Sequence, residues 1–141
     1  MAQDLGLDFA AGPSVSGLFG SDISAGANQT SSAIDLGAPT PLAIGIEAVI
    51  ILAAGTPAGN KQAVISLQWS HDNSDFDDAT NMDLGMIVAM ETASTTYKKN
   101  RTIPVQARYL KIDVKNDHSS GPAITGSGSS ITLYDVFGDQ A

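Results

Sequence analysis

Apolar and polar residues alternate with a period of two along most of the chain, and turn residues interrupt this pattern about every ten to fifteen residues from residue 30 onward. Such alternation predicts β-strands with one face toward a core and the other toward water. Short strands at regular spacing are typical of a sandwich or barrel. We therefore predict an all-β, antiparallel sandwich of about seven or eight strands.

The predicted strands span residues 29–37, 41–53, 62–70, 83–90, 94–105, 107–117 and 128–138. In 41–53 we expect Leu42 to share the buried face with Ile44 and the even-numbered residues that follow. In 62–70 the alternation places Trp69 in the core. No stretch keeps helical periodicity over three turns, so we expect almost no helix.

The first 27 residues keep no sustained period and are rich in Ala, Gly and Ser. Isolated large apolar side chains in such a segment cannot form a core of their own. We predict an extended N-terminal arm over residues 1–27, lying along a β-sandwich domain of residues 28–141 or docking on a partner. The candidate partner-binding residues of this arm are Leu5, Leu7, Phe9, Leu18 and Phe19.

Length and charge narrow the function classes. A chain of 141 residues is one ordinary domain. Its net charge of −8 repels polyphosphate and argues against nucleic acid as a partner. The apolar run 41–55 is too short for a membrane span and contains Glu47, so we expect no membrane insertion. The absence of cysteine excludes disulfides and thiol chemistry.

Basic residues are concentrated in one part of the sequence, between Lys98 and Lys115. In an acidic protein this predicts a basic strip, which favours self-assembly or docking on a charged partner. The alternative is that exposed lysines only protect strand edges from aggregation. The candidate residues of the strip are Lys98, Lys99, Arg101, Arg108 and Lys111.

A cluster of aspartates follows the predicted strand 62–70 and suggests a calcium loop, whose ligands would be Asp72, Asp75, Asp77 and Asp78. In an EF-hand register the sixth position would be glycine and the twelfth glutamate, but Asp78 and Leu84 stand there. We therefore favour a solvated turn whose side chains cap its own backbone, and keep calcium as a minor alternative.

Catalytic motifs are also missing from the sequence. There is no G-x-S-x-G elbow, and the two histidines, His71 and His118, have no ligand spacing. We expect a protein that is not an enzyme and that needs no cofactor.

Two stretches resemble a known fold family. "LQWSHDNSDF" (67–76) followed by "RTIPVQARYLKIDVKND" (101–117) is similar to the pattern of discoidin-like, galactose-binding-type jelly rolls. The resemblance implies a jelly-roll-like sandwich with Trp69 and Phe76 as framework residues. It also keeps open a carbohydrate-binding module, with or without calcium, that uses the loops around residues 72–78 and 118–121.

Taken whole, the chain resembles the capsid decoration, or cement, proteins of tailed bacteriophages. The features in question are a short cysteine-free β-domain, the arm, the strand "ARYLKIDVKND" and the C-terminal "ITLYDVFGDQA". The resemblance implies a non-enzymatic virion protein, made in the host cytoplasm, that binds the major capsid protein on the outer capsid surface. It also implies a homo-oligomer, with a trimer favoured.

Overall fold

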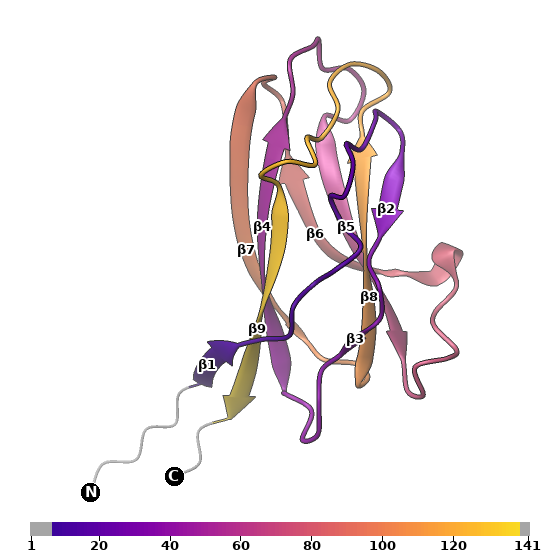
Figure 1. Ribbon diagram of the computed structural model, residues 1–141, viewed down its shortest axis with the longest axis vertical. Coiled ribbons are helices and arrows are strands. Elements are labelled where there is room, and N and C mark those ends of the chain that lie inside the picture. Colours follow the sequence, from indigo (N-terminus) through magenta and orange to yellow (C-terminus); the bar gives the residue numbers. More distant parts are fainter. Residues whose placement is uncertain (1–6, 139–141) are drawn as a thin grey trace, which may run out of the picture.

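The computed structural model describes residues 7–138, with only the backbone of Leu7, and shows two antiparallel sheets packed face to face (Figure 1). The strands are β1 (Leu7–Ala11), β2 (Asn28–Thr30), β3 (Ile34–Asp35), β4 (Ala43–Leu52), β5 (Gln62–Ser70), β6 (Asp83–Ala89), β7 (Thr95–Pro104), β8 (Tyr109–Asp117) and β9 (Ser130–Gly138). A single 3-10 turn, η1 (Ala79–Asn81), is the one helical element of the described residues, and none of their helices could cross a membrane.

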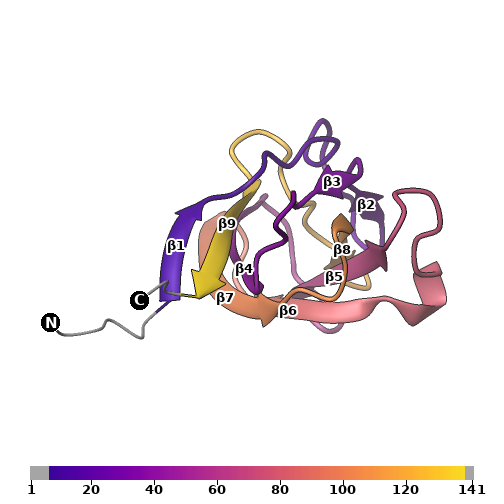
Figure 2. The same cartoon turned by 90° about the horizontal axis from the view of Figure 1, so that it is seen from below.

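One sheet, which we call sheet A, has the order β1-β9-β4-β7. The other, sheet B, has the order β2-β8-β5-β6, and β3 also pairs with β8. If β2 and β3 are counted as one interrupted strand, the chain forms eight strands that pass repeatedly between the two sheets, as in a jelly roll. Figure 2 shows the two layers end-on. The predicted all-β antiparallel sandwich is confirmed.

The core lies between the sheets and follows the predicted alternation. Trp69 of β5 is 5% exposed, and Leu110 and Ile112 of β8 are fully buried. Ile44 through Leu52 of β4 contribute every second residue to the same cluster. Trp69 is therefore a core residue, as predicted.

Two local predictions were wrong. Leu42 is 64% exposed, because the chain bends at Leu42 itself and β4 begins only at Ala43. The predicted strand 29–37 is interrupted after Thr30, because the hydroxyl of Ser31 accepts the backbone N–H of Ile112 at 2.9 Å. A side chain there replaces a backbone carbonyl of the ladder.

The region predicted as an arm contacts the sandwich over its described length. β1 pairs with β9, and Ile23 is buried in a two-way backbone bridge with Ile124. Leu18 and Phe19 are partly buried against the core. Leu5 lies outside the described residues. Thus Leu18 and Phe19 cover the protein's own core, and Phe9 is the described arm residue that stays open to solvent.

Asn116 of β8 is fully buried and joins several segments. Its Nδ2 group donates to the carbonyls of Ile23 at 3.0 Å and Pro122 at 3.1 Å. Because Nδ2 makes both bonds, Oδ1 must be the acceptor for His118 Nδ1, which lies 2.6 Å away and carries the hydrogen. This network connects residues 12–27 to β8 and to the loop that follows it.

Candidate functional site

An exposed apolar patch covers one end of the outer face of sheet A. Ile131 and Leu133 of β9 face the core, so Tyr134 and Val136 belong to the outer face. In register with them lie Gly45 of β4, opposite Tyr134, and Phe9 of β1, opposite Val136. Leu42 stands next to this region. We call Phe9, Leu42, Gly45 and Tyr134 the docking patch.

Exposure within the docking patch is high for apolar side chains. Phe9 is 60%, Leu42 64% and Tyr134 36% exposed, whereas Val136 on the same face is fully buried. The patch also contains a shallow groove of about 320 Å³, lined by Phe9, Gly45, Ile46, Glu47, Asn100, Arg101, Thr102 and Tyr134. A rimmed apolar surface of this kind is a candidate interaction site.

Gly45 is what leaves the groove open. A Cβ atom at this position would meet Tyr134 Cβ at 3.4 Å and Phe9 Cε1 at 4.0 Å. Both rings therefore lie close to the backbone of β4, and an added Cβ would fill the space between them at ordinary contact distance. The missing side chain creates a hollow between two aromatic rings, the kind of pocket that accepts an apolar anchor of a partner.

Of the basic residues of β7, Arg101 lines the groove, whereas Lys99 lies opposite the core residue Ala48 and points toward sheet B. Lys98, Lys99 and Arg101 are all exposed on β7, the edge strand of sheet A. Lys98 lies 3.6 Å from the carboxylate of Glu47, and Lys99 Nζ donates to the Ile87 carbonyl at 2.8 Å. Arg101 makes no ion pair among the residues that the structure describes. It is therefore a cation at the groove rim that an acidic partner could bind.

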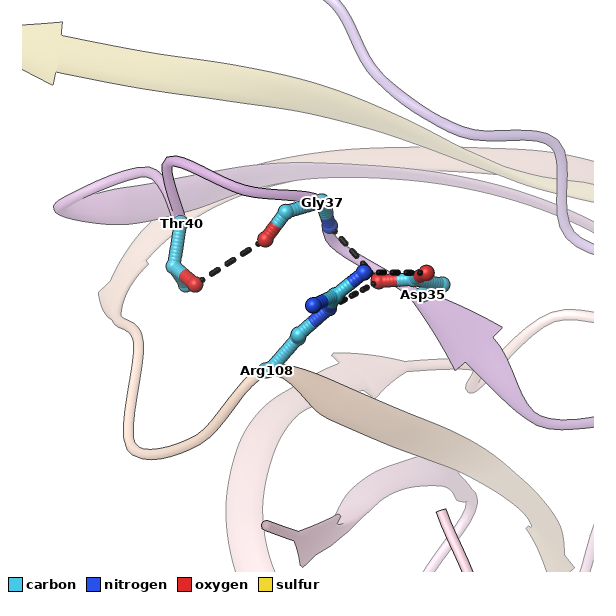
Figure 3. A network of polar contacts seen from close by, with 4 residues as sticks. All are labelled: Asp35, Gly37, Thr40 and Arg108. Atoms are coloured by element: carbon cyan, nitrogen blue, oxygen red, sulfur yellow. Dashed lines mark hydrogen bonds and ion pairs between the residues drawn. The ribbon is translucent and has the colours of Figure 1, made fainter. Parts of the chain in front are cut away.

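The other two residues of the predicted basic strip lie on sheet B, so the structure divides the strip. Arg108 bonds Asp35 at 2.8 and 3.0 Å (Figure 3). Its guanidinium also lies over the Tyr109 ring. The Arg108 guanidinium and the Gly37 N–H hold the pKa of Asp35 below its ordinary value. Lys111 Nζ lies 4.4 Å above the Phe76 ring. Arg108 and Lys111 therefore both have partners within the protein, on the side of sheet B.

The aspartate cluster forms a capped turn. Asp72 Oδ1 accepts the N–H groups of Asp75 and Ser74 and the hydroxyl of Ser70, each at 2.9 Å, and these bonds lower its pKa to about 2. Asp77 accepts the N–H of Trp69 at 3.0 Å. Asp75 and Asp78 are exposed. Within residues 7–138, no three acidic or histidine side chains gather as a metal site would require.

The two loops of the carbohydrate alternative lie far apart. Ser70 pairs with Tyr109 at one end of β8, and Gln62 pairs with Asp117 at the other. The nine residues of β8 separate these ends by about 25 Å. His118 is also buried, at 1% exposure. The loops after β5 and β8 therefore cannot form one site, and only a polar hollow beside the aspartate turn, bordered by Trp69 and His71, is left for a sugar.

Asp135 is an unusual residue beneath the edge strand. It shares the inward side of β9 with Leu133 and lies between Ala10 of β1 and Ile44 of β4. Its Oδ1 is buried without a hydrogen-bond partner. Burial raises the pKa of Asp135 above its ordinary value, because the charged form loses hydration.

We predict that Asp135 makes the fold less stable as pH rises. Because the pKa of Asp135 is raised in the folded state, its contribution to the stability of the fold is fully present below the unfolded-state pKa of 3.8. This contribution is lost as the pH rises through the folded-state pKa. Asp135→Asn should therefore be more stable than the wild type at pH 7, and this advantage should shrink toward pH 4. Urea unfolding at both pH values checks this, with Asp8→Asn on the exposed side chain of β1 as control. An advantage that stays constant with pH would contradict it.

The sequence reasoning missed most of the docking patch. The sequence indicates Tyr134 only as one of three tyrosines, with Tyr97 and Tyr109, that would form a sugar platform if they converged in space, and it predicts Leu42 in the core. The signal that could have indicated β1 is the period-two spacing of Leu5, Leu7 and Phe9.

Comparisons with known proteins give little that bears on this site. No protein-family model and no curated protein matches the sequence. Among solved structures, the dimeric latent PorU of Porphyromonas gingivalis matches with 18% identity and a TM-score of 0.47. The match covers 94% of this chain and 12% of that one, so this chain spans a small part of PorU. A likeness at this score supports no statement about fold or function.

Proposed function

We propose that this protein is a non-enzymatic structural protein of a tailed-bacteriophage virion, which binds the major capsid protein and stabilises the shell. The observation that carries the proposal is the docking patch, where Phe9, Leu42 and Tyr134 expose apolar surface and where Phe9 and Tyr134 line a groove. The resemblance of the whole sequence to decoration proteins supplies the identity of the partner.

Energetically, a few aromatic or aliphatic anchors can supply most of the affinity of an interface. The docking patch offers two aromatic rings on rigid strands, which lose little conformational entropy on binding. Because these rings stand on hydrogen-bonded strands of sheet A, their positions are set before the partner arrives. This favours binding to a fixed surface such as an assembled shell.

Charge contributes to partner choice. The protein carries a net charge of −8, so it is repelled by acidic surfaces everywhere except near the basic rim of the groove. Arg101, which makes no ion pair among the described residues, can bind a carboxylate at two points. We therefore expect the capsid site to present an apolar residue beside an acidic one.

Stabilisation would follow from mass action without chemistry. A protein that binds the assembled shell and not its separated subunits shifts the equilibrium toward the shell. The size of the effect depends on the concentration of the protein relative to its dissociation constant.

The test mixes the purified protein with empty shells of the phage that encodes it. We expect saturable cosedimentation with the shells and a rise in their melting temperature, measured by calorimetry. Shells that neither bind the protein nor gain heat stability would contradict the proposal. Binding to a glycan array in place of shells would instead support the carbohydrate-binding alternative at the polar hollow beside the aspartate turn.

A further inference from the structure

The two edge strands of sheet A differ in their protection against pairing. β7 carries Lys98, Lys99, Arg101 and Pro104, which are the usual devices that keep an edge from adding another strand. β1 has the sequence LDFAA, without lysine, arginine or proline. All of its described side chains, from Asp8 to Ala11, are exposed. Besides its short length, β1 has only Asp8, on the inward side opposite Phe137, to limit the addition of a further strand.

The hydrogen bonds of β1 show which backbone groups are free. The N–H of Gly12 donates to the Leu133 carbonyl at 3.0 Å, directly after the paired stretch. In antiparallel strands the direction of the bonds alternates from residue to residue, so Asp8 and Ala10 also bond toward β9. The backbone groups of Leu7, Phe9 and Ala11 then point to the open edge. In the described residues, β1 pairs with β9 alone.

We propose that β1 pairs with the β1 strand of a second copy of this chain, antiparallel and centred on Phe9. In this register Phe9 lies opposite the second copy's Phe9, and Leu7 lies opposite its Ala11. These are the residues whose backbone groups are free, so each of them gains its hydrogen bonds.

Charge agrees with this register. Asp8 lies opposite the second copy's Ala10, so the one charged residue of β1 does not meet its own copy. The same pairing through β7 would place lysines and arginines of two copies against one another, which is unfavourable. The occupant of the β1 edge is therefore a second copy of the same strand, related by a two-fold axis.

The two-fold axis stands perpendicular to sheet A, because paired residues of antiparallel strands share a face. Both docking patches then lie on the same side of one continuous eight-stranded sheet. Such a dimer could bind two sites on a shell at once and gain from their effective concentration. The dimer contact itself does not depend on the proposed function and needs no capsid.

The first test uses a proline that blocks only the free edge. Ala11→Pro removes an N–H that points away from β9, so β1 stays paired with β9 while the added strand is obstructed. Ala11→Ser keeps the N–H and is the matched control. In sedimentation equilibrium we expect dimers for the wild type and Ala11→Ser and monomers for Ala11→Pro. A wild type that is monomeric or trimeric, or an Ala11→Pro variant that still dimerises, overturns the proposal.

The second test reads the register, since the chain contains no native cysteine. Phe9→Cys should form a disulfide-linked dimer on mild oxidation, because the central residues face each other at a Cα separation of about 5.5 Å. Ala11→Cys is the control, because in this register residue 11 of one copy and residue 11 of the other lie four residues apart along the paired strands, or about 13 Å. Equal crosslinking of both variants, or none for Phe9→Cys, overturns the register.

These results separate the dimer from the capsid role. If the dimer is wrong, the wild type sediments as another species, but its docking patch still cosediments with shells. If the capsid role is wrong, shells bind nothing, but Phe9→Cys still crosslinks.

Discussion

Replacing Asn116 with alanine is expected to lower the free energy of unfolding by about 2 kcal/mol or more, because two buried groups lose their partner together and a third loses one of its two donors. The carbonyl of Pro122 loses its donor and the N–H of His118 loses its acceptor, whereas the carbonyl of Ile23 keeps the N–H of Ile124 at 2.9 Å. A buried polar group left unsatisfied costs about 1–3 kcal/mol. Urea unfolding, followed by far-ultraviolet circular dichroism, measures the loss.

Asn60→Ala is the matched control. Asn60 also donates from Nδ2, to the carboxylate of Asp117 at 3.0 Å, but the bond is exposed and water replaces it. We expect a loss within about 0.5 kcal/mol for this variant. Similar losses for Asn60→Ala and Asn116→Ala would show that the buried network does not hold residues 12–27 to the sandwich.

The fold could be predicted because its strands are encoded locally. Alternation in 62–70 predicts β5 with Trp69 in the core, and 107–117 similarly predicts β8. β1 escaped prediction because five residues next to Ala- and Gly-rich sequence carry little periodic signal, and β9 supplies its pairing from far along the chain. Register between distant strands is a tertiary property that one sequence does not display.

The candidate site was harder to predict for the same reason. Phe9, Gly45 and Tyr134 are far apart in sequence and meet only through the pairing of β1, β9 and β4. Leu42 has the same parity as the buried residues of β4, but the bend at Leu42 exposes its side chain. The basic strip was contiguous in sequence, yet the crossing between β7 and β8 sends its residues to different sheets. Proximity in sequence therefore did not predict which residues share one surface of the protein.

Two lysines in the docking patch are expected to have the largest effect on function. Leu42→Lys combined with Tyr134→Lys places charge where we propose that a capsid subunit packs, while both positions are exposed enough to leave the fold intact. Loss of a hot-spot anchor costs about 2 kcal/mol or more, so losing two should weaken binding at least about a hundredfold. Phe9 is left unchanged, so the strand that would form the dimer contact is kept.

The matched control is Ile87→Lys, at 37% exposure on β6 of sheet B, which adds the same kind of charge to a solvent-exposed apolar residue of the opposite sheet. The measurement is cosedimentation of each variant with shells over a range of protein concentrations, giving a dissociation constant for each. We predict that Ile87→Lys binds like the wild type and that the Leu42→Lys, Tyr134→Lys double variant stays in the supernatant. A double variant that binds shells as tightly as the wild type would contradict the assignment of the docking patch.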